Sequence, residues 1–155
     1  MFLYNSNQAV VSYILKSFLL CSVVAMSMAL ILNYFEVFKG DSPSENITFY
    51  DVIGASLVSP FFEVGIIYIL VSILGWVTES KNIKAIIVAA ILSSIHSLVF
   101  PFWGLVSFFS FFVFSISYLV WSVRKIWLGL FVSMSIHCLL NFFSLLFVYF
   151  GQFYY

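Results

Sequence analysis

The sequence predicts an all-α integral membrane protein, a single domain over residues 1–155 built as a bundle of about five transmembrane helices. First, 64% of its residues are hydrophobic and only 8% are charged, whereas an ordinary soluble domain has about 25% charged residues. Second, the apolar residues form runs close to the roughly 20 residues that a helix needs to cross a bilayer. Third, the 6 basic and 6 acidic residues cancel, so no net charge points to nucleic acid. A lipid bilayer is therefore the expected partner of most of the surface.

Each predicted span follows an apolar run and ends at polar or helix-breaking residues. The first run is longer than the core of ~7–15 residues in a signal peptide and lacks a basic start, so we expect a retained span. Pro101 ends the third run because proline breaks a helix, and Arg124 and Lys125 separate the fourth from the fifth. The five predicted spans are residues 11–34, 51–77, 83–100, 103–123 and 126–149.

The charged turns predict the orientation of the bundle. If five segments cross, the turns at residues 78–84 and 124–125 lie on one side and hold 4 basic residues. The opposite side receives the acidic connection at residues 36–46 together with Asp51. Basic residues mark the cytoplasmic side of a membrane, so we expect a cytoplasmic N-terminus and a C-terminus outside.

Three ionisable residues lie deep in the predicted spans: Glu63, His96 and His137. At about 1.5 Å per residue, both histidines lie about 18 Å from the basic side, while Glu63 and Asn141 lie about 24 Å from it. A lone membrane histidine is often a helix–helix hydrogen bond, but an ionised glutamate alone in lipid costs several kcal/mol. The shared depth therefore predicts one polar site enclosed by the second, third and fifth spans.

The residue types at this predicted site indicate hydrolysis. A glutamate with histidines can hold and deprotonate a water molecule, and an asparagine beside a histidine can donate hydrogen bonds to an oxyanion. The sequence has no His-Glu-x-x-His motif of zinc proteases and no Gly-x-Ser-x-Gly elbow. Its aspartates, Asp41 and Asp51, lie at loops or span ends. Paired-aspartate and serine-triad membrane proteases are therefore disfavoured.

A glutamate, then a histidine, then His-x-x-x-Asn, each on its own span, resembles the CAAX protease and bacteriocin-processing (CPBP) family of intramembrane proteases. The third motif of that family is intact from His137 to Asn141, and its second, Phe-x-x-x-His, corresponds to residues 92–96. The first, Glu-Glu-x-x-x-Arg with a proline three residues before it, is similar to residues 60–68. The resemblance covers residues 51–155, and the order of the motifs is more specific than any one of them.

The first motif departs from the family pattern. Pro60 aligns Glu63 with the first glutamate, which puts Val64 at the second glutamate and Tyr68 at the arginine. The other register would make Glu63 the second acid and leave it in hydrocarbon without its arginine, which is costly. In the favoured register the acid and the arginine are lost together, and we expect a less rigid site.

The resemblance implies an intramembrane endopeptidase that cleaves a membrane-associated peptide or protein substrate. It makes Glu63 the base that activates water and His96 a residue that orients this water. It makes His137 and Asn141 the groups that stabilise the oxyanion. Family members process prenylated tails or act in bacteriocin self-immunity, and both remain open for this chain. We expect the chain in the bacterial inner (plasma) membrane.

The same residues are compatible with two other functions and with one cofactor. A catalytically impaired immunity or scaffold protein is favoured by the incomplete first motif. A small proton or metal transporter would use the same ionisable residues, but no repeat symmetry is visible in the sequence. Glu63, His96 and His137 could ligate zinc with water in the fourth position. We expect no cofactor because Asn141 is a better oxyanion donor than metal ligand.

Overall fold

The computed structural model describes residues 2–35, 48–99 and 102–151, and every regular element in these ranges is a helix. Five helical stretches among them are long and apolar enough to cross a membrane. The chain is thus an all-α integral membrane protein, as predicted from its composition. The elements are η1 (Phe2–Tyr4), α1 (Val10–Tyr34), α2 (Phe49–Ile53), the π-helix η2 (Gly54–Val58), α3 (Ser59–Leu74), α4 (Lys81–Val99), α5 (Trp103–Trp121) and α6 (Ile126–Gly151).

The observed boundaries differ most from the prediction at the second span. It begins at Thr48, whose side chain forms a reciprocal capping box with Asp51, and it ends at Leu74 instead of residue 77. Residues 75–77 are apolar but form a turn that begins at Gly75, so hydropathy alone extended the predicted span too far. The connection at 36–46, and the end of the third span at residues 100 and 101, lie outside the described residues.

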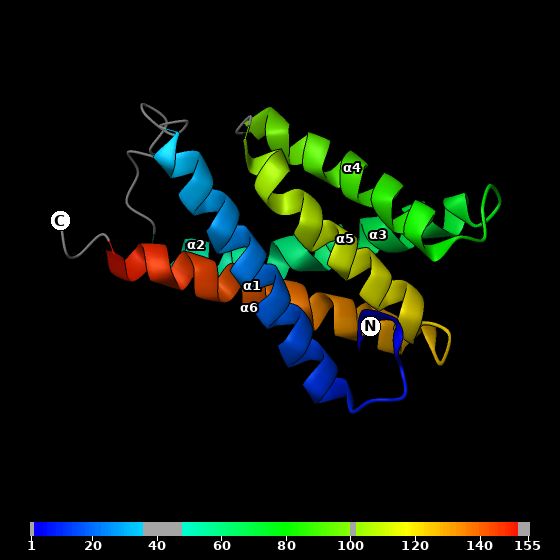
Figure 1. Ribbon diagram of the computed structural model, residues 1–155. Coiled ribbons are helices and arrows are strands. Elements are labelled where there is room, and N and C mark those ends of the chain that lie inside the picture. The colour runs from blue at the N-terminus through cyan, green and yellow to red at the C-terminus, as the bar shows by residue number, and fades with distance from the viewer. Residues whose placement is uncertain (1, 36–47, 100–101, 152–155) are drawn as a thin grey trace.

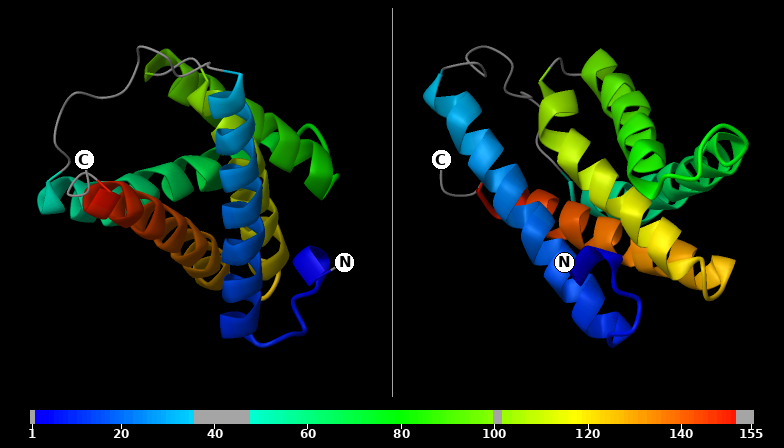
Figure 2. Two further views of the ribbon diagram at one scale, coloured as in Figure 1. Left: turned by 60° about the vertical axis from the view of Figure 1, so that its left-hand side comes forward. Right: turned by 45° about the vertical axis from the view of Figure 1, so that its right-hand side comes forward.

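Helix α5 lies at the centre of the bundle. Within its span 61% of the residues are buried inside the protein, against 17–28% for the other four spans. Its most extensive neighbour is α4, and it also packs on α6, α1 and α3. Figures 1 and 2 show α4 beside α5, with α1 running alongside α5 and crossing over α6. The side chains of α5 therefore form much of the interior that the other helices share.

Two glycines allow α5 to approach its neighbours closely. A Cβ added at Gly104 would lie 1.9 Å from Ser97 Oγ and 2.6 Å from the Ser93 carbonyl of α4. A Cβ at Gly129 of α6 would lie 2.7 Å from the carbonyl oxygen of Tyr118. Small residues at such contacts are typical of membrane helix pairs, in which close backbone approach provides the attraction.

The N-terminal segment folds against the end of the bundle that holds the basic turns. The Tyr4 hydroxyl donates to Asn82 Oδ1 at 2.7 Å, and Arg124 Nη2 donates to Asn7 Oδ1 at 3.2 Å. Leu3 is fully buried. The N-terminal residues and both basic turns therefore share one side of the bundle, as the five-span topology requires.

The second span is helical throughout but is not one continuous α-helix. The N–H of Ser59 bonds to the carbonyl of Gly54, five residues back, which is the π pattern. Pro60 follows at once and has no N–H to donate. A π turn holds an extra residue relative to an α turn, and such turns are frequent at functional sites. This one lies immediately before the turn that carries Glu63.

Candidate functional site

Glu63 lies one turn into α3 and is directed into the bundle. Its side chain is 14% exposed. The hydroxyl of Ser59, one turn earlier on the same face, donates a hydrogen bond to Glu63 Oε1. This bond occupies one carboxylate oxygen and leaves Oε2 for the residues that approach from other helices. Oε2 is buried and has no hydrogen-bond partner among the described residues.

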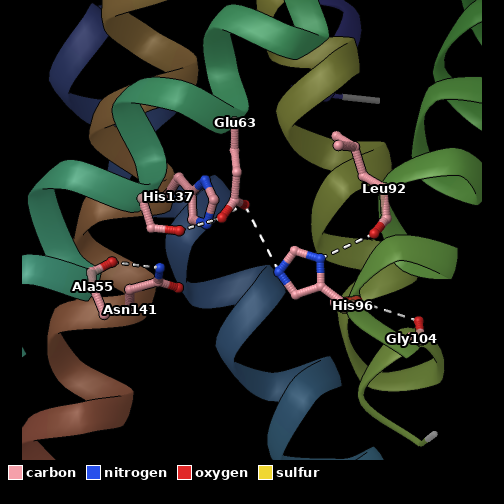
Figure 3. A network of polar contacts seen from close by, with 9 residues as sticks. Ala55, Glu63, Leu92, His96, Gly104, His137 and Asn141 are labelled. Atoms are coloured by element: carbon pink, nitrogen blue, oxygen red, sulfur yellow. Dashed lines mark hydrogen bonds and ion pairs between the residues drawn. The ribbon is translucent and has the colours of Figure 1, made fainter. Parts of the chain in front are cut away.

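Two histidines from two other helices approach that oxygen. His137 Nε2 of α6 lies 3.5 Å from Glu63 Oε2, and His96 Nε2 of α4 lies 3.9 Å from it. Figure 3 shows both imidazole rings turned toward the carboxylate. The exposed fractions of their side chains are 5% for His137 and 28% for His96. The structure thus brings together the three ionisable residues that the sequence places at similar depth.

The hydrogen bonds around the rings define which nitrogen carries the proton in each neutral histidine. His96 Nδ1 lies 3.0 Å from the Leu92 carbonyl oxygen, which can only accept, so Nδ1 carries the proton and Nε2 keeps its lone pair. His137 Nδ1 has no hydrogen-bond partner among the described residues. A proton on Nε2 of His137 faces the carboxylate, the acceptor it approaches. One ring then offers an acceptor beside Glu63 and the other a donor.

Two phenylalanines of α5 hold the rings in place. Phe114 stacks on His137 with ring centroids 4.4 Å apart and an interplanar angle of 24°. Phe111 meets His96 edge-on at 4.9 Å and His137 edge-on at 5.8 Å, so one ring contacts both imidazoles. Both phenylalanine rings are buried. Since His137 Nδ1 has no hydrogen-bond partner among the described residues, these ring contacts orient the imidazole of His137.

Asn141 lies one turn beyond His137 on α6, and its amide is engaged with the second span. Asn141 Nδ2 donates to the carbonyl oxygen of Ala55 at 3.0 Å, which joins α6 to the π turn (Figure 3). The amide keeps a second N–H, and the residue also lines the cavity described below. Asn141 is therefore close to the other three residues, with one of its two donors used by the fold.

A cavity of about 350 Å³ adjoins these side chains. All five spans contribute to its wall, and α5 contributes the most residues, whereas the sequence predicts an enclosure by the second, third and fifth spans alone. Most of the lining is apolar or small. The lining residues are Ala25, Ala55, Ser59, Glu63, His96, Trp103, Val106, Ser107, Ser110, Phe111, Phe114, His137, Leu140, Asn141, Ser144 and Leu145.

A metal ion needs several ligands around one point. Within residues 2–35, 48–99 and 102–151, no group of three His, Cys, Asp or Glu side chains is arranged to hold a metal ion. No chemical step below passes through a metal, and the metal content stays a prediction.

The two positions where the first motif departs from the family pattern carry no compensating charge. Val64 is buried, with 2% of its surface exposed. Tyr68 is partly exposed and packs edge-on against Tyr118, with ring centroids 6.1 Å apart. Apolar and aromatic packing thus occupies the places of the acid and the arginine.

Three contributors to the site escape the sequence reasoning: Ser59, the pair Phe111 and Phe114, and the backbone of Ala55. Ser59 lies four residues before Glu63, a spacing that could have indicated a helical pair. The other two depend on which face α5 presents to its neighbours and on the π turn. No local signal in the sequence reports either.

The fold and this cavity define a class: an integral membrane helical bundle with a carboxylate, two imidazoles and a carboxamide gathered on the wall of an internal cavity. Comparisons of the chain with protein-family models, with curated proteins and with solved structures find no match. The resemblance to the CPBP family therefore stays a prediction, carried by the motifs and their order.

Proposed function

We propose that this chain is an intramembrane endopeptidase of the CPBP type, which hydrolyses a peptide bond with water activated by Glu63. The observation that carries the proposal is the position of Glu63 Oε2, 3.5 Å from His137 Nε2 and 3.9 Å from His96 Nε2, on the wall of a cavity. General bases work within about one water's reach of the groups they serve. A membrane-associated peptide or protein is the proposed substrate.

The reaction begins with a water molecule held between Glu63 and His96. The water donates one hydrogen bond to Glu63 Oε2 and the other to the lone pair of His96 Nε2. These two bonds direct a lone pair of the water oxygen at the scissile carbonyl carbon. As the C–O bond forms, Glu63 takes the proton from the water and the carbonyl π electrons move to oxygen. Glu63 then gives this proton to the amide nitrogen, the oxyanion re-forms the carbonyl as the C–N bond breaks, and a carboxylic acid and an amine are produced. The proton of the acid passes to the amine, so the products leave as a carboxylate and an ammonium group.

The negative charge that develops on the carbonyl oxygen needs donors. His137 in its Nε2–H form provides one, held in place by the stacked ring of Phe114. The second N–H of Asn141, not used by Ala55, provides another. Donors fixed in advance in a water-poor site are worth about 10²–10³ each in rate. The apolar lining of the cavity strengthens them by lowering the local dielectric constant.

The proposed location is the bacterial inner (plasma) membrane with a cytoplasmic N-terminus. Its support is the common side shared by the N-terminal segment and the basic turns, which the Tyr4–Asn82 and Asn7–Arg124 hydrogen bonds join.

The proposal is tested by looking for new peptide ends. Wild-type chain and the Glu63→Gln variant are expressed at equal level in bacterial membranes, and newly formed N-termini of membrane proteins are labelled and identified by mass spectrometry. Glu79→Gln, the same change at an exposed residue after α3, is the matched control. We expect ends that depend on Glu63 and survive Glu79→Gln. Identical sets of ends from all three chains would remove the base from the mechanism.

A second candidate function is a catalytically impaired membrane protein that binds a partner through the same cavity. The specific observation in its favour is the apolar and aromatic packing at Val64 and Tyr68, where the family pattern has charge. It predicts that Glu63→Gln changes neither membrane peptide ends nor any cellular phenotype of the wild-type chain. The same experiment therefore separates the two functions.

A further inference from the structure

The π turn leaves one backbone carbonyl without a donor from its own helix. In an α-helix the Ala55 carbonyl would accept from the N–H of Ser59, but that N–H bonds to Gly54 instead. In a π-helix it would accept from residue 60, which is proline and has no N–H. Neither helical pattern therefore supplies an N–H donor to the Ala55 carbonyl. In a membrane interior, where water does not replace the missing donor, such a carbonyl needs another partner.

Asn141 provides that partner. Its Nδ2 donates to the Ala55 oxygen at 3.0 Å, across 86 positions of sequence. Because the acceptor is a carbonyl, the amide nitrogen must face it, which also defines the orientation of the side chain. This bond provides the donor that the Ala55 carbonyl lacks within its own helix.

The π turn lies next to the base. Ser59 ends the π turn, and its hydroxyl donates to Glu63 Oε1. Conversion of the π turn to an α turn would rotate one side of the break by about 100° relative to the other, the rotation of one helical residue. Glu63 Oε2 would then lose its approach to His96 and His137, or the α2 end of the span would leave α6. The turn that aims Glu63 thus depends on the carbonyl that Asn141 satisfies.

We infer that Asn141 is a positioning residue for Glu63: it holds the proline-generated π turn through the Ala55 carbonyl. The inference rests on the proposed function only for what Glu63 does chemically. In this arrangement a backbone turn and a cross-helix amide hold Glu63 where the acid and the arginine of the first motif are missing.

The test is a double-mutant cycle between two residues that share a carbonyl. The full chain in lipid nanodiscs is compared as wild type, Asn141→Leu, Pro60→Ala and the double variant, by thermal unfolding. Asn141→Leu fills a similar volume but has no hydrogen-bond donor, so we expect Tm to fall by about 4–8 °C. Pro60→Ala restores an N–H at position 60, so Asn141→Leu in that background should cost much less. Ser135→Ala, which loses only a bond to its own helix at Phe131, should leave Tm unchanged.

A second readout tests positioning apart from stability. A hydrophobic carbodiimide modifies carboxyl groups in membranes, and the extent at Glu63 is measured by mass spectrometry. We expect several-fold faster modification of Glu63 in Asn141→Leu, with return toward the wild-type rate in the double variant. Tyr13→Phe, which removes hydrogen bonds elsewhere in the bundle, should leave the rate unchanged although it lowers Tm.

The outcomes are separable. Additive losses in the cycle, or a fall in Tm with unchanged modification of Glu63, would overturn the positioning role. Neither readout requires hydrolysis, so failure to find cleaved peptides would remove the proposed function and leave the coupling between residues 60 and 141 to be judged alone.

Discussion

Two buried polar clusters in the described part of the bundle are built in opposite ways. In the first, between α1 and α5, the fully buried Tyr13 hydroxyl bonds to the Leu3 carbonyl and the Ser117 hydroxyl, each at 3.0 Å. In the second, Glu63 Oε2 and His137 Nδ1 are buried without hydrogen-bond partners among the described residues, beside a cavity. The first cluster uses its principal polar group to join helices. The second keeps an ionisable oxygen available.

The buried polar atoms without hydrogen-bond partners among the described residues also differ between the two clusters. Near Tyr13 they are neutral and include the Ser17 hydroxyl and the Trp121 indole nitrogen. Near the cavity they include atoms of a carboxylate and an imidazole, which cost far more to bury in hydrocarbon when charged. A membrane protein retains such a cost where it serves a function. The comparison therefore favours a structural role for the first cluster and supports the proposed chemistry at the second, and substitutions at four residues test that division.

The largest effect is expected at Glu63. Glu63→Gln removes the base, so hydrolysis should fall by about 10²–10⁴-fold, the usual contribution of general acid–base catalysis. The neutral amide costs less in the membrane than a carboxylate, so thermal stability should hold or rise. Cleavage rates and Tm of the purified chain in nanodiscs check both. A variant that loses stability as much as activity would place Glu63 with the structural cluster and break the comparison.

The next effect is expected at the aromatic wall. Phe114→Ala removes the ring stacked on His137 and leaves a cavity, which should cost about 3–5 kcal/mol of unfolding free energy. Phe114→Leu fills most of the space but does not stack, so stability should largely return while hydrolysis stays low. Phe108→Ala, at a ring that is 38% exposed on the same helix, is the control. If Phe114→Leu restores activity fully, the ring is only core packing.

What the sequence predicts about the site follows from the regularity of helices. A constant rise per residue converts positions 63, 96 and 137 into depths, and groups that are costly in lipid tend to meet at a shared depth. The face that α5 presents to the site is a tertiary property, because its Phe residues occur on several sides of the helix. The π turn is also tertiary, since the carbonyl that Pro60 leaves open is satisfied by Asn141, 86 positions from Ala55. The depth of a residue in the membrane thus follows from its position in the sequence, whereas the direction of its side chain depends on how the helices pack.

The structural cluster provides the reciprocal test. Tyr13→Phe removes the hydroxyl and leaves the Leu3 carbonyl without that donor, which should cost about 2 kcal/mol. For a chain of this size, Tm should fall by about 4–8 °C. Hydrolysis below that temperature should be unchanged, because Tyr13 does not line the cavity. A loss of activity at full occupancy of the folded state would mean that the two clusters are coupled through α5.

The smallest effect is expected at Ser59, and it sharpens the comparison most. Its hydroxyl occupies Glu63 Oε1 and so leaves Oε2 to face the two histidines. Ser59→Ala lets the carboxylate rotate, and we expect kcat to fall about tenfold, equal to about 1.4 kcal/mol of transition-state stabilisation. Ser59→Thr keeps the hydroxyl and should recover most of the rate. Ser94→Ala, which removes a hydroxyl bonded to its own helix, should have no effect. Equal activity in all three variants would show that the carboxylate needs no orienting bond, and the contrast with the bonded Tyr13 hydroxyl would then reduce to burial alone.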